Sequence, residues 1–579
     1  MSGYSVEKNV QILIAVMKAN GIKKVVVNPG ATNISSIASM VNDGSFELYS
    51  AVDERGAAYM ACGLCAESGE PVALTCTGAT ASRNYFPALT EAYHRKLPIL
   101  AVTSSQDFAR RGNLSPQFID RTGYPPDSLR MSVQIPIIRT PEEERDAMLQ
   151  INRAVLELFR HGGGPVHINL ASDYINQFTV SSLEHVRILR RYTYGQSLPK
   201  FPARRRVAVA VGNHPRWNEA LTAAVDAFCE KYDAVVICDH SSGYWGKYRV
   251  FPSILATQEL YRSHLFDIDL LIHIGEEHGD YYTDGRLYSA KEVWRVSPDG
   301  EIRDHFGALT NTFEMSETAF FRHYAAKADQ SGESQRAYYD DFQKEIRELW
   351  DAVPELPFSN IWLAQQTIPR FPSDCPLELG VSNTMRAWTF FDFPEKTYTL
   401  ANTGCRGIDG AVPTLIGMSL ANPNRVHFAV MGDLTFFYSF NTLGNRHVGA
   451  NLRILLVNNG CGAEFHLYPH RAYEIYNGDE DAINQFVAAG GHTGTKSRDL
   501  VRHWAEDLGF AYLSAASKAE YLANLDTFLD VKSADKPMIF EVFTTPADEC
   551  EALRRIRSIK ANPSLKLKRT IKNALGGKR

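Results

Sequence analysis

The chain has 579 residues, of which 44% are hydrophobic and 22% are charged, and its formal net charge is -5 at pH 7. This composition excludes a disordered chain, a collagen-like repeat and a disulfide scaffold, and the length allows about three to five domains. No stretch reaches the roughly 18 uncharged apolar residues that a membrane span requires, and nothing has the pattern of a secretory leader. We therefore expect a cytoplasmic globular protein.

Short apolar runs alternate with longer helical patterns over the first 180 residues. Four runs have the composition of buried strands, at residues 23–28, 71–77, 98–103 and 165–170. The segments between them are long enough to form helices. This rhythm predicts a parallel sheet that is covered by helices on both faces.

Two further units of the same kind follow. Residues 192–206 contain two prolines and three successive arginines and are expected to form a linker. Apolar runs then come at 207–212, 234–238, 270–274 and 294–297, and again, after a charged helical region at 333–355, at 398–400, 427–431, 453–457 and 538–543. The sequence thus predicts three doubly wound parallel-sheet α/β domains, at residues 1–185, 200–330 and 355–550.

A basic segment ends the sequence. From Arg554 to Arg579 there are ten Lys or Arg and no Asp or Glu. We expect residues 551–579 to form a solvated basic tail that lies along the acidic body. Binding to an acidic partner, a nucleic acid or a membrane face is the less favoured alternative, and nothing else in the sequence resembles a nucleic-acid module.

The nine cysteines are scattered along the chain without repeated pairs. The one C-x-x-C pair, Cys62 and Cys65, lies in a stretch of small residues with helical character. A structural zinc site needs further Cys or His ligands, and none is nearby. We therefore expect free buried thiols rather than a metal or redox centre.

The strongest signal for chemistry lies where two expected strands of the third unit end. The run 427–431 leads to Gly432 and Asp433, and the run 453–457 leads to Asn458 and Asn459. Because open α/β sheets bind ligands at the carboxyl ends of their strands, a carboxylate and an amide oxygen converge on one rim. Such oxygen ligands suit Mg²⁺. Taken alone, each pair could also be ordinary turn chemistry.

This pattern resembles the thiamine diphosphate (ThDP) motif of the decarboxylases and carboligases related to pyruvate oxidase and acetolactate synthase. The resemblance implies that Asp433, Asn459 and the backbone carbonyl of Cys461 hold Mg²⁺, which anchors the diphosphate of ThDP. It also implies further cofactor contacts, from Gly432, Leu434, Thr435, Asn402, Thr77 and Gly78.

A second motif of that family lies near the N-terminus. Glu54, in the segment 52–61, resembles the family's catalytic glutamate, although a Glu in this setting is more often a plain helix N-terminal charge. The order and spacing of the two motifs favour the functional interpretation. The resemblance implies that Glu54 shares a proton with the aminopyrimidine of ThDP. It also implies a homodimer or homotetramer, because one subunit supplies the glutamate and another the diphosphate motif.

Within the family, the sequence resembles the menaquinone-pathway branch, the 2-succinyl-5-enolpyruvyl-6-hydroxy-3-cyclohexene-1-carboxylate synthases, which use 2-oxoglutarate and isochorismate. The segments 69–74, 84–93 and 407–410 carry this resemblance. It implies that Ile408 wedges beneath the cofactor, with a plain core Ile as the alternative. It also implies that Gln117 acts on the substrate side.

The sequence departs from that branch where the branch binds its acids. Thr32 and Thr403 stand where the synthases have arginines, and the loop 275–282 is acidic and aromatic. Each lost charge-assisted hydrogen bond would cost roughly 1.5 to 3 kcal/mol. We therefore expect altered substrate contacts. The candidates are Thr32, Arg386, Arg406, Phe465 and Tyr468, with His466 as an acid or base or, alternatively, a structural histidine.

The favoured hypothesis is a ThDP- and Mg²⁺-dependent enzyme that decarboxylates a 2-oxo acid and joins the product to an acceptor by a new C–C bond. The alternatives are a simple 2-oxo acid decarboxylase, the menaquinone-pathway synthase itself with a rearranged set of arginines, and an inactive ThDP-fold scaffold. The presence of Glu54, Asp433 and Asn459 argues against the scaffold.

Overall fold

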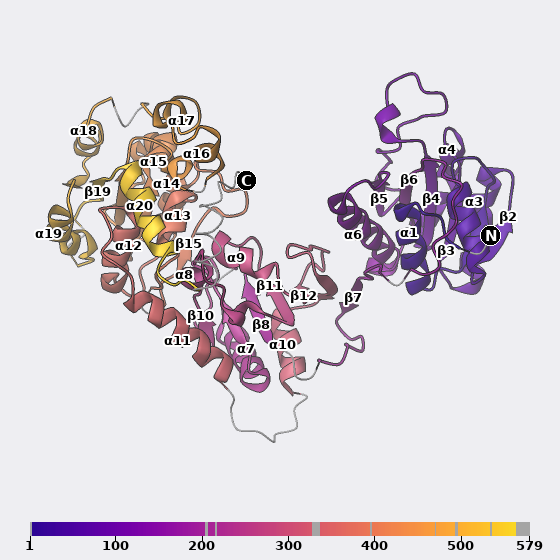
Figure 1. Ribbon diagram of the computed structural model, residues 1–579, viewed down its shortest axis with the longest axis horizontal. Coiled ribbons are helices and arrows are strands. Elements are labelled where there is room, and N and C mark those ends of the chain that lie inside the picture. The colour runs from indigo at the N-terminus through magenta and orange to yellow at the C-terminus, as the bar shows by residue number, and fades with distance from the viewer. Residues whose placement is uncertain are drawn as a thin grey trace. The chain divides into compact units, whose positions relative to one another are not determined.

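The computed structural model describes residues 3–183, 185–202, 206–214, 217–326, 336–393, 396–468, 470–491, 496–532 and 535–562. The chain forms two compact units. One comprises Met1–Gln196 with Gly300–Thr312, and the other comprises Ser197–Asp299 with Phe313–Arg579 (Figure 1). The expected linker at 192–206 thus contains the junction between the units. Most of the predicted basic tail, from residue 563 on, lies outside the described residues.

The first unit is built on a six-stranded parallel sheet with the strand order β2-β1-β3-β4-β6-β5. Its strands are β1 (Lys24–Val27), β2 (Glu47–Ser50), β3 (Val72–Cys76), β4 (Ile99–Ser105), β5 (Met131–Ile135) and β6 (Val166–Ala171). One face packs on α1 (Lys8–Ala19), α2 (Ile34–Asp43) and α6 (Pro141–Glu157), and the other on α3 (Glu54–Ser68) and α5 (Phe86–Arg95). Between α3 and α5 lies the short helix α4 (Ala81–Asn84).

Local sequence fixes where these helices begin. The Asp53 carboxylate accepts a hydrogen bond from the Gly56 amide and caps α3, so that Glu54 is its first residue. Thr140 and Glu143 form a reciprocal capping box at the start of α6, with Pro141 in the first turn. The predicted catalytic glutamate is therefore held at a helix N-terminus just beyond β2.

The second unit contains two sheets. In the middle sheet β8 (Val207–Val211), β9 (Val235–Ile237), β10 (Arg249–Val250), β11 (Leu270–Ile274) and β12 (Glu292–Ser297) follow the order β10-β9-β8-β11-β12. Helices α7 (Glu219–Tyr232) and α10 (Glu317–Ala326) pack on one another beside it. The charged region expected at 333–355 contains α11 (Ala337–Asp351).

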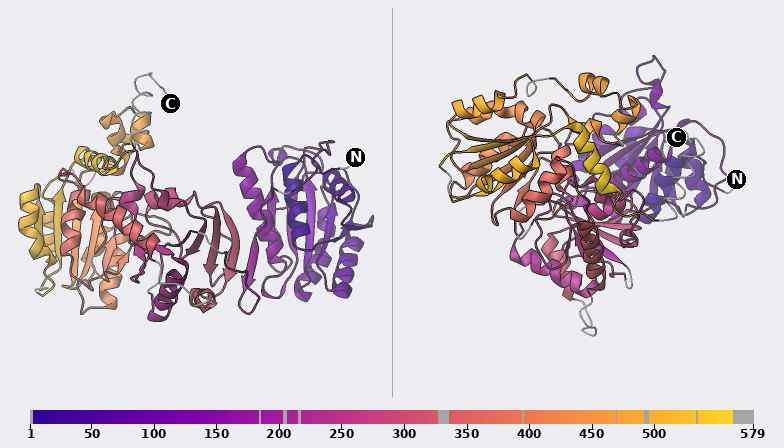
Figure 2. Two further views of the ribbon diagram at one scale, coloured as in Figure 1. Left: turned by 60° about the horizontal axis from the view of Figure 1, so that its bottom comes forward. Right: turned by 60° about the vertical axis from the view of Figure 1, so that its left-hand side comes forward.

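The C-terminal sheet has six parallel strands in the order β15-β14-β16-β17-β19-β18. They are β14 (Leu377–Leu379), β15 (Thr399–Leu400), β16 (His427–Gly432), β17 (Leu452–Asn458), β18 (Ala511–Ala515) and β19 (Met538–Phe543). Helices lie on both sides of this sheet (Figure 2), among them α12 (Asn360–Thr367), α14 (Ala411–Ala421), α19 (Lys518–Leu529) and α20 (Pro546–Arg557). The prediction of three parallel-sheet α/β domains is confirmed.

The nine cysteines are free thiols, and seven of them are buried. Among the described residues, no helix has the length and the apolar character needed to cross a membrane.

Candidate functional site

A cavity of about 170 Å³ opens at the carboxyl ends of β14, β16 and β17 in the second unit. Eight residues that the sequence singled out line it together: Ile408, Gly432, Asp433, Leu434, Thr435, Asn459, Cys461 and Phe465. The parallel strands bring these positions to one edge of the sheet, as the topology of open α/β sheets requires. This cavity is the candidate cofactor site.

Asp433 is the only carboxylate on the β16 side of the cavity and begins the short helix α15 (Asp433–Ser439). One carboxylate oxygen accepts from the Leu434 amide (2.8 Å) and the other from the Gly460 amide (2.6 Å). The residue is 3% exposed. Burial raises the pKa of Asp433 to about 7, although these backbone hydrogen bonds work in the opposite direction.

The two asparagines after β17 have different environments. The Asn458 side chain turns into the sheet, where its amide group donates to the Glu541 carboxylate (2.7 Å). The Asn459 side chain lines the cavity, and its oxygen accepts a long hydrogen bond from the Cys461 amide (3.4 Å). Only Asn459 therefore has an oxygen available for a ligand.

The donor set fits Mg²⁺. The described residues contain no group of three or more His, Cys, Asp or Glu that could hold a metal ion. An ion at Asp433 would therefore have one carboxylate, the Asn459 amide oxygen, the Cys461 carbonyl and further oxygens from phosphates or water. That is an all-oxygen, partly hydrated set of the kind Mg²⁺ prefers.

The cavity is also lined by Asn360 and by Ser382, Asn383 and Thr384, at the start of α13 after β14. Ser382 has φ 68° and ψ -128°, a conformation that L-residues rarely adopt. Behind this turn Glu549 of α20, 1% exposed, accepts hydrogen bonds from the Asn360 amide (3.0 Å) and the Thr544 hydroxyl (2.9 Å). Burial raises the pKa of Glu549 to about 7.

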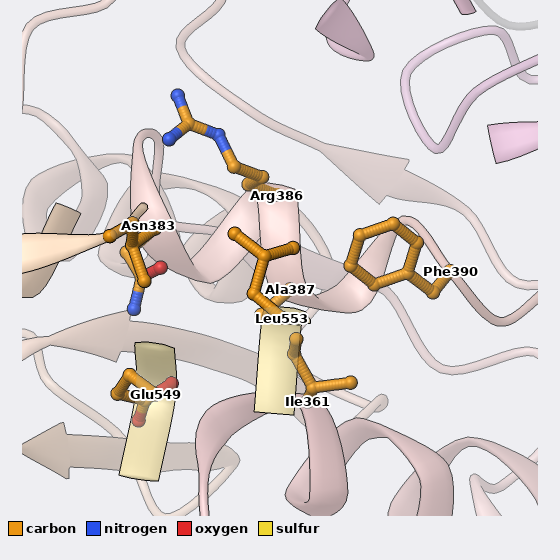
Figure 3. A pocket seen from close by; sticks show the side chains of 8 residues that line it. Ile361, Asn383, Arg386, Ala387, Phe390, Glu549 and Leu553 are labelled. Carbon is orange, nitrogen blue, oxygen red and sulfur yellow. The ribbon is translucent and has the colours of Figure 1, made fainter. Parts of the chain in front are cut away.

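Figure 3 shows the Asn383 and Glu549 side chains facing one another across a small second cavity of about 10 Å³. Arg386, from α13 (Asn383–Trp388), also contributes to its lining, but its guanidinium points away from Glu549. This void is large enough for about one water molecule. Glu549 thus holds the backbone of Asn360, one of the residues that line the main cavity.

A cationic rim lies beside the main cavity. Arg386 forms an ion pair with Glu464 (2.8 Å), which itself lines the cavity. Arg406 lies over the Tyr281 ring at 4.0 Å and Arg386 over the same ring at 5.2 Å. Arg406 has a left-handed backbone (φ 54°) and donates to the carbonyl of His278 (2.8 Å). Tyr281, the first residue of α9 (Tyr281–Leu287), was not among the predicted site residues.

Besides Arg386 and Arg406, three predicted residues of the second unit do not line the cavity. His466 is buried and its ring bonds to the Asn484 side chain (2.9 Å), which favours the structural alternative. Tyr468 is exposed, and its amide donates to the Cys550 sulfur. The Asn402 side chain lies so close to Gly410 that a Cβ there would overlap it.

The first unit gathers another predicted group at the carboxyl ends of β3 and β4. The hydroxyls of Thr32 and Thr77 lie 2.8 Å apart, and the Gly78 amide donates to the Thr32 hydroxyl (3.1 Å). A Cβ on Gly78 would lie 3.3 Å from the Gln117 carbonyl. Gln117 is exposed and has a left-handed backbone (φ 62°). These contacts form one polar cluster of Thr32, Thr77, Gly78 and Gln117.

Glu54 is half-buried within its own unit and accepts a hydrogen bond from Asn84 (3.1 Å). Three apolar residues near it in the sequence are exposed, Val52 (86% exposed), Tyr59 (47%) and Met60 (39%). The adjacent charged residues Asp53 and Arg55 are exposed as well, so that this part of the surface is mixed.

Two buried charged residues were not predicted from the sequence, one near Gly78 and one beside Asn458. Arg121, 3% exposed, lies under the Gly78 turn and donates only to neutral acceptors, among them the Ser82 hydroxyl (2.8 Å) and the Asn169 side chain (3.3 Å). Glu541 lies in the middle of β19. The sequence feature that could have indicated it is a single charged residue inside the apolar run 538–543, because acidic side chains are rarely fully buried unless they have a partner.

The family comparisons agree with this geometry. Residues 8–124 match the family described as "Thiamine pyrophosphate enzyme, N-terminal TPP binding domain", and residues 380–521 match "Thiamine pyrophosphate enzyme, C-terminal TPP binding domain". The two matched regions contain Glu54 and Asp433, respectively. The fold and these regions define a ThDP-dependent enzyme.

Relatives similar over nearly the whole chain carry the name 2-succinyl-5-enolpyruvyl-6-hydroxy-3-cyclohexene-1-carboxylate synthase. That of Bacteroides fragilis is 31% identical over 578 residues, that of Bacteroides thetaiotaomicron 30% over 568, and that of Phocaeicola vulgatus 29% over 583. Each alignment covers 95% of this chain and 98% of the relative. The chain belongs to the thiamine pyrophosphate enzyme family and resembles its branch of these synthases.

Proposed function

We propose that this enzyme decarboxylates a 2-oxo acid and joins the remaining acyl group to a carboxylated acceptor; the resemblance to the menaquinone-pathway branch implies 2-oxoglutarate and isochorismate as these two substrates. The observation that carries the proposal is the cavity in which Asp433, Asn459 and Ile408 meet. The relatives favour the synthase alternative over the more general carboligase.

Each residue has a task in this proposal. Asp433, Asn459 and the Cys461 carbonyl hold Mg²⁺ and, through it, the diphosphate, while Ile408 supports the cofactor from below. Bound ThDP supplies an electron sink for decarboxylation. Glu54 holds and returns a proton at the aminopyrimidine ring. Thr77 and Gly78 offer hydrogen bonds to the cofactor, and Thr32 and Gln117 offer them on the substrate side.

Arg406 suits the binding of a substrate carboxylate. No carboxylate of the described residues pairs with it, whereas Arg386 is already neutralised by Glu464. A cation at the carboxylate that leaves as CO₂ would stabilise the starting acid and slow its loss. We therefore assign Arg406 to a carboxylate that the product retains, which both 2-oxoglutarate and isochorismate possess.

We also propose that two copies of the chain complete each site. Exposed apolar residues lie just before and within the helix that Glu54 begins: Val52, Tyr59 and Met60. A second copy that covers them would desolvate the carboxylate and favour its protonated form. The variant Tyr59→Glu should then shift the protein toward monomers in light-scattering chromatography and lower its activity in parallel.

The decisive assay supplies the protein with ThDP, Mg²⁺ and 2-oxoglutarate and follows CO₂ release and product formation with and without isochorismate. Glu54→Gln should still bind ThDP but lose turnover. Release of CO₂ without a joined product would indicate a simple decarboxylase. A wild-type chain that binds neither ThDP nor Mg²⁺ would indicate the scaffold, and unchanged turnover of the Glu54 variant would remove the assigned role of that residue.

A further inference from the structure

We propose that Glu541 is a positioning residue for the metal-binding turn and that it acts through Asn458. The inference rests on the proposed function, since the turn in question is the one assigned to Mg²⁺. Neither residue touches the cavity. Their role would be to hold Asn459 and Gly460 in the one arrangement that presents the metal ligands.

Glu541 lies at the centre of a buried hydrogen-bond chain. It is 1% exposed, on a strand paired with β17 on one side and β18 on the other. One carboxylate oxygen accepts from the Tyr512 hydroxyl (2.7 Å) and the other from the Asn458 amide group (2.7 Å). Because a carboxylate can only accept, this contact fixes which end of the Asn458 amide faces the sheet.

The orientation of Asn458 then fixes the turn. Its oxygen accepts from the Gly460 amide (3.2 Å), and the same N–H donates to the Asp433 carboxylate (2.6 Å). Gly460 has φ 77°, which glycine adopts without strain. One amide proton is thus shared between the inner asparagine and the proposed metal ligand, so that Glu541, Asn458, Gly460 and Asp433 form a continuous chain.

Stability alone does not account for Glu541. Its hydrogen bonds in the described chain come from Asn458 and Tyr512 and not from a Lys, Arg or His, and burial raises its pKa although the charge of Arg498 acts in the opposite direction. Burying a carboxyl without a cation costs free energy that an apolar residue at this position of a strand would not incur. A role in fixing the turn explains why a carboxyl, with two accepting oxygens, occupies the position.

Glu541→Leu tests the inference because leucine is of similar size but has no oxygen that could accept a hydrogen bond from Asn458. The Asn458 amide group is then no longer held in the orientation that turns its oxygen toward the Gly460 amide. Residues behind metal ligands typically contribute 10- to 100-fold in metal affinity. We expect the dissociation constant for Mg²⁺, measured by calorimetry at saturating ThDP, to rise by about 10-fold or more.

A second variant separates positioning from folding. In Asn458→Asp combined with Glu541→Gln, the new amide donates to the new carboxylate, which can also accept from Gly460. The pair should bring the Mg²⁺ affinity back to within about threefold of the wild type. Tyr521→Phe removes another buried hydroxyl of the same domain, 2.6 Å from Thr367, and should leave Mg²⁺ binding unchanged.

Three results would overturn the proposal: unchanged Mg²⁺ affinity in Glu541→Leu, a double variant that binds Mg²⁺ no better than Glu541→Leu, or a loss of affinity in Glu541→Leu that matches its loss of folded protein in urea. A wild-type chain that binds no ThDP and Mg²⁺ would instead refute the proposed function, and this role with it. Binding of ThDP and Mg²⁺ by the wild type therefore distinguishes failure of the proposed role of Glu541 from failure of the proposed function.

Discussion

Glu378 should make the C-terminal domain less stable as the pH rises. It lies on β14 between Leu400 of β15 and Ala429 of β16, is fully buried, and neither of its oxygens has a hydrogen-bond partner. Burial raises its pKa to about 8, against an ordinary value of 4.5. Between about pH 4.5 and pH 8, Glu378 therefore keeps its proton in the folded chain but has released it in the unfolded chain.

The sign follows from linkage. The titration of Glu378 does not change the free energy of unfolding below pH 4.5. Between pH 4.5 and roughly pH 8 it lowers that free energy by about 1.4 kcal/mol per pH unit, because the folded chain binds a proton that the unfolded chain has lost. The full cost is on the order of 4 to 5 kcal/mol. Glu378→Gln removes the titration and keeps the shape. Its stability relative to the wild type should rise steadily from pH 5 to pH 8.

Urea unfolding at pH 5, 6.5 and 8 measures this difference, and the other buried acids cancel because both proteins contain them. Glu355→Gln serves as the matched control, since Glu355 is exposed and its side chain reaches only Lys518. A stability difference that stays constant across this pH range would refute the reasoning, because it would mean that Glu378 releases its proton at an ordinary pH in the folded chain.

Three further outcomes are expected. Asp433→Asn should weaken Mg²⁺ binding by more than the roughly 10-fold expected of residues behind the ligands, and calorimetric affinity equal to the wild type would exclude it as a ligand. Arg406→Gln should raise KM for the carboxylated substrate by about 10-fold at unchanged ThDP affinity; Arg425→Gln, which breaks a surface pair with Asp374, is the control and should leave KM unchanged. Gly30→Ala should cost about 1 to 3 kcal/mol of unfolding free energy because its Cβ would overlap Thr77, whereas Gly63→Ala, with open space around it, should cost nothing.

The central strands could be predicted from the sequence because they are buried on both faces and consist of apolar runs. The run expected at 270–274 is β11, and that at 538–543 is β19. Most edge strands could not, although the run expected at 398–400 contains the edge strand β15. β2 (Glu47–Ser50) is half-exposed and has a charged residue, so that its sequence carries no apolar run. The interior strand β14 escaped prediction for another reason, since Glu378 interrupts a segment of only three residues.

The residues of the candidate site also fall into those that could be predicted from the sequence and those that could not. Motifs at strand ends, such as Asp433 and Asn459, could be predicted because the topology brings such ends together. Contacts made by distant segments could not be predicted: Tyr281 reaches Arg406 from the middle sheet, and Glu541 reaches Asn458 from the neighbouring strand. Their spacing in the sequence carries no signal, since only the packing of the sheets brings them into contact.

The buried acids of the C-terminal domain share a physical feature that bears on the cofactor. Asp433, Glu541 and Glu549 accept from amides and hydroxyls, and no cation of the described residues pairs with them. Burial raises the pKa of each. Fully ionised carboxylates here would repel a diphosphate at close range. Magnesium at Asp433 would offset that repulsion and keep this carboxylate ionised. The neutral donors around Glu541 and Glu549 orient those two carboxyls without a cation, at the cost of stability at higher pH.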